Sequence, residues 1–294
     1  MSFAVHAFAE DEAPARRLAD VLGLPFRAVA AHVFPDGEVL PQVSPGDETV
    51  LAYAGLDRPN GKLVRLLLAC DAWRRAGVRR LVLVAPYMCY MRQDAVFSPG
   101  QPLSRDVIGG LLGAQFDRIV TVEPHLHRTA DLGPVFAPAS TTAVSAAEAL
   151  GEALGAAGNP LVVGPDEESE PWARKVAGVL GCDHAVLRKV RLGDRRVRLI
   201  LPPELEVRGR RVALIDDICS SGGTLAEALR LFAGLGAAAL EVAVVHALFD
   251  AAAGRKLAKA GAGRVISTDS CAHSTNAVAL APLLARALAE EFVA

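Results

Sequence analysis

The chain has 294 residues, of which 52% are hydrophobic, so it is long enough for two domains with buried cores. Its net charge of -2 implies neither the strongly basic surface of many nucleic-acid-binding proteins nor a polybasic membrane anchor. No run of about 18 apolar residues predicts a membrane span, and the first residues lack the pattern of a signal peptide. Five scattered cysteines without a CxxC pair favour free thiols in a reducing, cytoplasmic compartment.

The first half of the chain alternates short β-branched runs with longer helical patterns. The short runs predict strands at 3–8, 49–54, 79–87 and 117–123. The segments between them predict helices at 11–22, 60–76 and 104–115. Because the strands are apolar on both faces and separated by helices, we expect a parallel sheet that helices cover on both sides.

The second half repeats this alternation after a Pro/Ser/Thr stretch at 138–142, which predicts a domain boundary. Strands are predicted at 161–166, 184–190, 211–217, 240–248 and 264–269. Helices are predicted at 143–157, 170–180, 223–235, 251–260 and 279–292. Segment 191–210 is basic and contains a Pro-Pro break, so it predicts a projecting hairpin or flap between two core strands. We therefore expect an α/β protein with one domain over 1–142 and a second over 143–294.

The stretch RVALIDDICSSGGTL at 211–225 carries the most specific chemistry. An apolar strand ends in two carboxylates, Asp216 and Asp217, and a turn of small residues leads into a helix. In a parallel sheet, this arrangement places a ligand at the carboxyl end of the strand. The N–H groups and hydroxyls of the turn suit a phosphate monoester. The turn consists of Ser220, Ser221, Gly222, Gly223 and Thr224.

The two carboxylates beside this turn repel a phosphate but accept hydrogen bonds from sugar hydroxyls. A ligand with a phosphate at one end and a vicinal diol at the other satisfies both features, and ribose 5-phosphate has that shape. The alternative is an ordinary glycine turn with a helix N-cap. The order of strand, Asp-Asp, small-residue turn and helix favours the ligand site over that alternative.

The segment IDDICSSGGT resembles the ribose-5-phosphate loop of the phosphoribosyltransferase fold. Phosphoribosyltransferases share that loop with ribose-phosphate pyrophosphokinases, the phosphoribosyl pyrophosphate (PRPP) synthetases. The resemblance implies two tandem phosphoribosyltransferase-like domains, each a mostly parallel sheet flanked by helices. It also implies that Asp216, Asp217 and the turn 220–224 bind ribose 5-phosphate.

Two segments of the first half resemble parts of the synthetases that the transferases lack. FPDGEV at 34–39 is similar to their adenine-contacting motif, which implies ATP binding by Phe34, Asp36 and Glu38. The segment 86–104 is similar to their ATP-reading loop, which implies ATP binding by Arg92, Gln93 and Asp94. An aromatic ring offers stacking area to a base, and an arginine fork suits phosphate oxygens. The alternatives are a Pro-Asp-Gly turn for the first segment and a solvated connection for the second.

Two further segments resemble the magnesium-binding parts of the synthetases. VEPHLHR at 122–128 implies His125 as a ligand of Mg²⁺, with His127 as a rival. GPDEES at 164–169 implies that Asp166 contacts Mg²⁺ or ribose. A carboxylate suits Mg²⁺ better than an imidazole does. Both segments depart from the family's usual residues, and a surface loop and a capped turn are the alternatives.

RKVRLGDRR at 188–196 resembles the flexible flap of the synthetases, which implies catalytic roles for Lys189 and Arg191. A solvated basic strand edge is the alternative. By contrast, STDSCAHSTNAVAL at 267–280 departs from the family's apolar, proline-containing stretch. The roles of Cys271 and His273 therefore stay open.

The resemblance extends from about residue 3 to 290 and implies an Mg²⁺-dependent enzyme. The implied reaction transfers the pyrophosphoryl group of ATP to the C1 hydroxyl of ribose 5-phosphate, giving PRPP and AMP. The resemblance also implies a homodimer or homohexamer whose ATP site takes residues from a neighbouring subunit, without nucleic-acid or membrane partners. The alternatives are a PRPP-using phosphoribosyltransferase, a catalytically altered or regulatory homologue, and a kinase that acts on another sugar phosphate.

Overall fold

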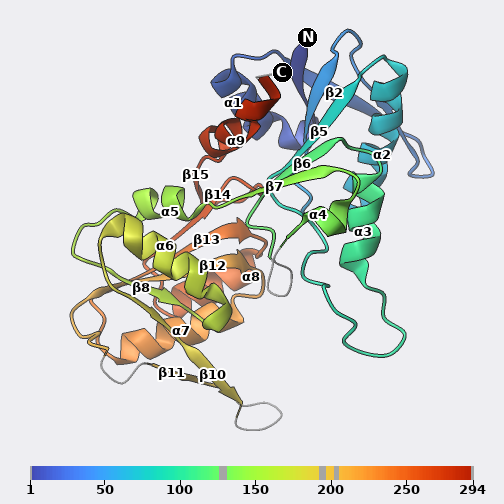
Figure 1. Cartoon of the computed structure of the whole chain (residues 1–294). Coiled ribbons are helices and arrows are strands. Elements are labelled where there is room, and N and C mark those ends of the chain that lie inside the picture. The colour runs from blue at the N-terminus through green and yellow to red at the C-terminus, as the bar shows by residue number, and fades with distance from the viewer. Residues whose placement is uncertain (1, 126–130, 192–196, 202–204, 293–294) are drawn as a thin grey trace. The chain divides into compact units, whose positions relative to one another are not determined.

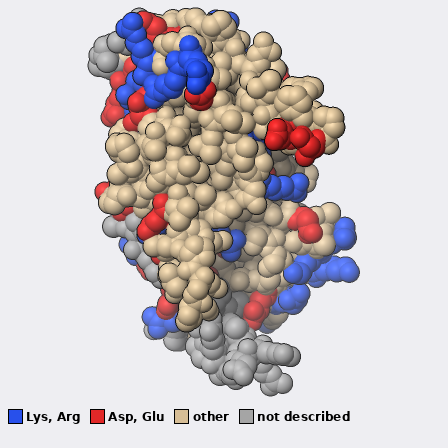
Figure 2. Space-filling model, turned by 90° about the vertical axis from the view of Figure 1, so that its right-hand side faces the viewer, with Lys and Arg blue, Asp and Glu red and all other residues tan. Residues whose placement is uncertain are grey.

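The computed structural model describes residues 2–125, 131–191, 197–201 and 205–292 (Figure 1). The chain forms two compact units. The first contains the residues up to Val144 together with those from Ala279 onward, and the second contains Ser145–Val278. In the described ranges, no helix is long and apolar enough to cross a membrane. On the face in Figure 2, basic and acidic side chains lie among a larger number of uncharged residues.

The first unit is built on a seven-stranded sheet. Its strands are β1 (Phe3–Phe8), β2 (Phe26–Val33), β3 (Val39–Gln42), β4 (Thr49–Tyr53), β5 (Arg80–Ala85), β6 (Arg118–Val122) and β7 (Ser140–Val144). They follow the order β3-β2-β1-β4-β5-β6-β7. All neighbours are parallel except β2 and β3, which form an antiparallel hairpin at one edge. The parallel strands β4 and β6 are buried throughout, as their apolar sequences predict.

Helices cover both faces of this sheet (Figure 1). They are α1 (Glu12–Leu22), α2 (Pro59–Arg75), α3 (Ser104–Gly113), α4 (Gly133–Phe136) and α9 (Ala281–Leu288), with short 3₁₀ turns η1 (Ala9–Asp11) and η3 (Ala289–Phe292). The chain moves one way from β1 to β2 and the other way from β4 to β7. Right-handed crossovers therefore place α1 on one face and α2, α3 and α4 on the other. Helix α9 packs beside α1 and against β6 and β7, so it completes the first face.

The second unit is built on a six-stranded parallel sheet. Its strands are β8 (Leu161–Gly164), β9 (His184–Val186), β12 (Arg211–Cys219), β13 (Ala239–Ala247), β14 (Arg264–Thr268) and β15 (Asn276–Val278). They follow the order β15-β14-β13-β12-β8-β9. A separate antiparallel hairpin of β10 (Arg188–Arg191) and β11 (Val197–Ile200) precedes β12, where the sequence predicts a flap.

The helices of the second unit divide between the two faces of its sheet. They are α5 (Ala147–Leu154), α6 (Glu170–Leu180), α7 (Gly223–Gly234) and α8 (Ala251–Lys259), with a 3₁₀ turn η2 (Glu167–Ser169) before α6. Helix α5 packs on α6, and α7 packs on α8. Because β8 leads to β9 while β12 leads to β13 in the opposite direction, the strand order reverses between β8 and β12. Open parallel sheets bind ligands at such a reversal, outside the carboxyl ends of the strands.

The α/β architecture with two mostly parallel sheets is confirmed. The domain boundaries differ from the prediction, because residues from 279 onward belong to the first unit and not to a continuous domain over 143–294. The buried side chains of Leu284 and Leu288 explain this difference, since α9 packs on α1 and the first sheet. Residues 143 and 144, predicted as helical, instead end β7.

Glu291 fixes the returning segment to the first sheet. Arg80 donates to its carboxylate at 2.5 and 2.8 Å, and Arg118 donates at 2.8 Å. Arg118 also donates to Thr142 Oγ1 at 2.9 Å and to the carbonyl oxygen of Ala287 at 3.0 Å. The side chains of Glu291 and Arg118 are only 2% and 6% exposed. One buried carboxylate therefore compensates two guanidinium groups at the starts of β5 and β6.

Candidate functional site

The turn after β12 places exposed hydrogen-bond donors at the start of α7. Ser220, Ser221 and Gly223 are exposed, and Thr224 is half-buried in the first helical turn. The first N–H groups of a helix have no partner within it, and the helix dipole adds positive potential there. This turn can therefore bind an anion through amides and hydroxyls.

Gly222 determines the backbone path of this turn. Its φ of +64° lies in the left-handed region, which side chains other than glycine rarely adopt. Its carbonyl oxygen accepts a hydrogen bond from Ala226 N at 2.9 Å and so begins α7. A Cβ atom at this position would lie 3.4 Å from Cδ2 of Leu257, so the turn is in close contact with α8.

Three carboxylates gather at the carboxyl ends of β8 and β12, where the strand order reverses. Asp217 is buried, while Asp216 and Asp166 are half-buried. Burial, followed by the charges of Asp217 and Asp166, raises the pKa of Asp216 well above its ordinary value. A nearby cation or hydroxyl donors from a ligand would relieve this repulsion. The structure thus brings together the predicted sugar-binding carboxylates, Asp166 and the phosphate turn within one unit.

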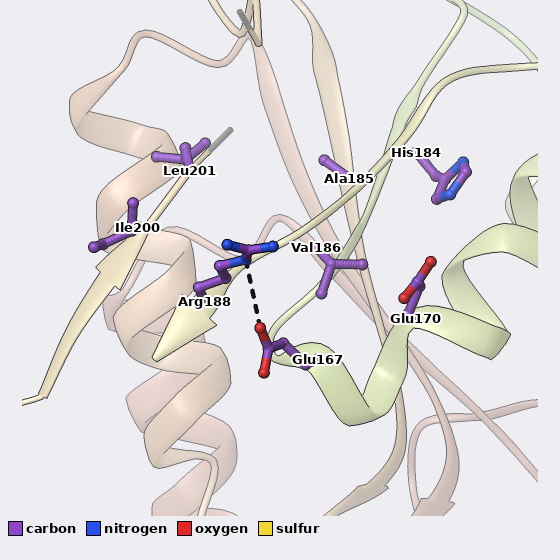
Figure 3. Close-up of a pocket in the computed structure, with 8 residues that line it drawn as sticks. All are labelled: Glu167, Glu170, His184, Ala185, Val186, Arg188, Ile200 and Leu201. Atoms are coloured by element: carbon purple, nitrogen blue, oxygen red, sulfur yellow. Dashed lines mark ion pairs between the residues drawn. The ribbon is translucent and has the colours of Figure 1, made fainter. Parts of the chain in front are cut away.

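The hairpin of β10 and β11 carries the two predicted catalytic residues. In its backbone ladder, Lys189 pairs with Leu199 and Arg191 pairs with Val197. A hollow of about 690 Å³ lies at the base of the hairpin, beside η2 and β9 (Figure 3).

One ion pair joins the base of this hairpin to η2. Arg188 lies 3.4 Å from Glu167, the residue after Asp166, and their side chains are 77% and 72% exposed (Figure 3). An ion pair this exposed contributes about 0–1 kcal/mol. This ion pair therefore connects the hairpin to the carboxylate cluster, but it contributes little to the stability of the hairpin's position.

In the first unit, the predicted adenine-binding segment is the turn between β2 and β3. Phe34 N donates to the carbonyl oxygen of Glu38 at 2.8 Å, and Glu38 N donates to Asp36 Oδ1 at 3.1 Å. The Phe34 ring is 39% exposed and makes an edge contact with His32 at 4.6 Å between ring centroids. The turn is ordered by its own hydrogen bonds, and Phe34 stays partly exposed.

The predicted phosphate-reading residues lie in the long loop between β5 and α3. Arg92 and Gln93 are exposed and Asp94 is half-buried. The backbone of Gln93 is fixed, because it donates to Tyr90 O at 3.1 Å and accepts from Arg105 N at 3.3 Å. Strand β5 is three positions from β2 in the sheet, so this loop and the β2–β3 turn leave the sheet roughly 14 Å apart. The sheet of one chain does not bring the two predicted ATP segments together at their strand ends.

His125 follows β6 in a tight turn. Glu123 and His125 have φ values of 39° and 45°, which is the left-handed region for residues that are not glycine. His125 N donates to Glu123 O at 2.8 Å, and Glu123 N donates to Val144 O at 3.0 Å. Such conformations cost roughly 1–3 kcal/mol and are enriched at functional sites. His127, the rival ligand, lies outside the described residues.

The chain matches one family over most of its length. Residues 4–115 match the N-terminal domain of ribose phosphate pyrophosphokinase, and residues 143–286 match the phosphoribosyl transferase domain. The ribose-phosphate pyrophosphokinase of Methanopyrus kandleri is 38% identical over 278 residues, which are 93% of this chain and 94% of that protein. This chain belongs to the ribose-phosphate pyrophosphokinase family.

Two more family members agree with this assignment. The ribose-phosphate pyrophosphokinase of Methanosarcina acetivorans is 33% identical over 93% of this chain and 95% of that protein. The crystal structure of phosphoribosylpyrophosphate synthetase from Mycobacterium smegmatis has a TM-score of 0.84 and 26% identity, and 99% of each chain is covered. The predicted family and the tandem phosphoribosyltransferase-like fold are both confirmed.

Packing links two residues of the segment 164–169, Gly164 and Ser169. A Cβ atom at Gly164 would lie 2.5 Å from the Ser169 hydroxyl, so only glycine leaves room for it. That hydroxyl donates to Asp166 O at 2.5 Å and accepts from Asp166 N at 3.2 Å. Gly164 and Ser169 thus act together to fix the backbone of Asp166.

His273, in the segment that departs from the family, supports the start of α8. Its Nε2 donates to the carbonyl oxygen of Phe249 at 3.0 Å, and its Nδ1 accepts from the Thr275 hydroxyl at 2.7 Å. Asp250, which follows Phe249 in the chain, caps α8 because its side chain accepts a hydrogen bond from Ala253 N at 2.9 Å. His273 therefore has a structural role beside the site. The thiol of Cys271 is buried, and the Ser270 hydroxyl donates to its sulfur at 3.9 Å.

The carboxylate cluster is not a complete metal cage. In the part of the chain that the structure describes, no group of three or more His, Cys, Asp and Glu side chains could hold a metal ion by itself. Mg²⁺ commonly keeps several waters and binds through one or two carboxylates plus substrate phosphates. An open set of half-buried carboxylates beside a phosphate turn fits that mode of binding.

Proposed function

We propose that this protein is a ribose-phosphate pyrophosphokinase that uses Mg-ATP and ribose 5-phosphate to make PRPP and AMP. The observation that carries the proposal is the juxtaposition at the end of β12. A turn suited to a phosphate begins three residues after Asp217, where β12 ends, at the strand reversal of a sheet in a member of this family. This geometry favours a sugar phosphate over a free nucleotide base at that position.

The sugar phosphate binds by its two ends. The 5-phosphate accepts hydrogen bonds from the amides and hydroxyls of Ser220, Ser221, Gly222, Gly223 and Thr224, and the helix dipole of α7 adds to the attraction. Asp216 and Asp217 accept hydrogen bonds from the ribose hydroxyls. These contacts fix the C1 hydroxyl for attack on the β-phosphorus of ATP.

In this proposal, residues of the first unit bind the nucleotide. Phe34, Asp36 and Glu38 contact adenine, while Arg92, Gln93 and Asp94 contact the ATP phosphates or the base. The distance between these segments in one sheet supports an ATP site completed by a second copy of the chain, in a homodimer or homohexamer. Val33 and Leu40 beside the β2–β3 turn are 61% and 58% exposed, which is consistent with an interface there.

In the proposed reaction, Asp166 of the second unit would hold Mg²⁺, and the ion would neutralise charge on the ATP phosphates. His125 of the first unit is the other residue proposed to bind Mg²⁺. Lys189 and Arg191 donate to the oxygens of the group in transfer and exclude water when the hairpin closes. Transfer of this kind depends on positioning and charge stabilisation and needs little covalent chemistry from the protein.

An assay with γ-labelled Mg-ATP tests the proposal. Label is expected in a pyrophosphorylated sugar, with AMP formed in equal amount and only when ribose 5-phosphate is present. AMP release that requires a different sugar phosphate would instead identify a related kinase. Failure to release AMP with either sugar phosphate, combined with consumption of PRPP, would identify a phosphoribosyltransferase and contradict the proposal.

Asp216→Asn is expected to raise the KM for ribose 5-phosphate by roughly 10–100-fold, since a hydrogen bond to a charged group contributes about 1.5–3 kcal/mol. Asparagine keeps the size of the side chain and removes its charge. Steady-state kinetics at saturating ATP measure the change. The matched control is Glu152→Gln on the exposed surface of α5, which should leave the KM unchanged.

A further inference from the structure

Helix α8 carries a lysine that contacts the phosphate-binding turn. Lys256 Nζ donates to the carbonyl oxygen of Ser221 at 2.7 Å. Ser221 lies in the middle of the turn that the proposed function assigns to the 5-phosphate, so this inference rests on that proposal. Neither the sequence motifs nor the resemblance to the family points to Lys256.

The lysine extends from a helix that is held by an N-cap and by packing. Asp250 caps the first turn of α8, and Leu257 is fully buried. Leu257 also lies beside Gly222, where a Cβ atom would be 3.4 Å from its Cδ2 and 3.7 Å from Cβ of Ala253. The backbone of the turn is therefore packed directly on α8, and Lys256 adds a polar contact to that packing.

The surroundings of Lys256 favour this contact. A hollow of about 230 Å³ between α7 and α8 is lined by Arg230, Ala252, Arg255, Lys256 and Lys259. None of these lining residues is acidic, so no carboxylate in the hollow competes for the ammonium group. Repulsion from the neighbouring cations further favours the position in which Lys256 binds a carbonyl oxygen.

This contact affects how the turn receives an anion. A loop that binds phosphate through its N–H groups must keep its carbonyl oxygens away from the ligand, because their partial negative charge repels it. A charge-assisted hydrogen bond from Lys256 fixes the Ser221 carbonyl on the α8 side of the turn. The same ammonium group also brings a positive charge close to the bound phosphate.

We propose that Lys256 is a positioning residue for the ribose-5-phosphate loop. It holds the Ser221 carbonyl against α8 and so maintains the turn in its phosphate-binding conformation. It does not contact the reacting atoms. Its loss should therefore weaken sugar-phosphate binding and leave the rate of chemistry at saturation nearly unchanged.

The test compares Lys256→Met with Lys259→Met in the full-length protein. Lys259 belongs to the same helix and lines the same cationic hollow, whereas Lys256 is the lysine that donates to Ser221 O. Lys256→Met is expected to raise the KM for ribose 5-phosphate about 5–10-fold with kcat changed by less than about twofold, because the turn loses one intramolecular hydrogen bond and keeps its own donors to the phosphate. Lys259→Met should match the wild-type protein in both parameters.

Two further measurements separate positioning from other roles. Lys256→Arg, which keeps a charged donor, should restore the KM to within about threefold of wild type. Calorimetry with ribose 5-phosphate alone should show the same loss of affinity for Lys256→Met, even if the wild-type protein releases no AMP and the proposed reaction fails. Equal KM values for Lys256→Met and Lys259→Met, a dominant loss in kcat, or an arginine variant as impaired as methionine would each overturn the inference.

Discussion

Lys189→Ala is expected to lower kcat by about 10²–10³-fold, the typical effect of removing one donor that stabilises charge in the transition state. The KM for ribose 5-phosphate should change little, because the phosphate turn and the sugar-binding carboxylates lie on β12 and α7, not on the hairpin of β10 and β11. The hairpin has its own two-stranded sheet, so the substitution should leave the six-stranded sheet intact.

Steady-state kinetics at saturating substrates, with circular dichroism to verify folding, measure this effect. Lys175→Ala provides the control, because Lys175 is an exposed lysine on α6 of the same unit. A Lys189→Ala variant with near-normal turnover would reject the catalytic assignment of the hairpin. Parallel losses in kcat and in calorimetric affinity for ribose 5-phosphate would instead indicate damage to the sugar site.

Glu291→Ala should destabilise the first unit by about 3 kcal/mol, because it leaves the buried guanidinium of Arg118 with only the exposed carboxylate of Glu290 as a countercharge. For a unit of this size, that loss lowers the midpoint of thermal unfolding by roughly 6–12 °C. Trp73 is buried in the first unit and Trp172 lies in the second, so fluorescence in a Trp172→Phe background reports on the first unit.

The neighbouring Glu290 offers a matched control, since its side chain is 85% exposed although it also lies near Arg118. Glu290→Ala should change stability by about 0.5 kcal/mol or less. Equal effects of the two substitutions would show that the buried pair contributes nothing particular to the attachment of this segment.

The stability of the first unit should also depend on pH through Glu291. Burial alone raises the pKa of this carboxyl, but hydrogen bonds from Arg80 and Arg118 together outweigh burial and hold the pKa below its ordinary value of 4.5. The unfolded state therefore binds the proton more readily, and the stabilisation is present above pH 4.5 and lost as the pH falls through the lower folded pKa. Glu291→Ala should remove this part of the acid dependence, which unfolding at a series of pH values measures.

Long buried elements were predictable from the sequence, and short exposed ones were not. Strands β4, β6 and β12 follow continuous apolar runs, and helices such as α7 follow clear helical periodicity. By contrast, β2 is largely exposed, and β3 and β15 have only four and three residues, so neither burial nor length marks them. The return of α9 to the first unit depends on tertiary packing with α1, which local sequence cannot reveal.

In the candidate site too, some features were predictable from the sequence and others were not. The order Asp216, Asp217, small-residue turn and helix is local, and the structure places these residues together as predicted. The contact between Lys256 and Ser221 joins positions 35 residues apart, and Lys256 resembles any other surface lysine in the sequence. Gly164 and Ser169 are close in the chain, but the sequence does not show that they are in contact. The structure shows it, because a Cβ atom at Gly164 would lie 2.5 Å from the Ser169 hydroxyl.

The return of the last residues to the first sheet has a consequence for protein synthesis. Residues 145–278 leave the ribosome before 279–292, which supply α9 and the partner of Arg80 and Arg118. The second unit can therefore fold on the nascent chain before the first unit is complete. Until residues 279–292 emerge, the face of α1 that α9 covers is exposed, and Arg80 and Arg118 lack the carboxylate of Glu291. A chaperone that recognises apolar surface would meet the N-terminal half of the protein during that interval.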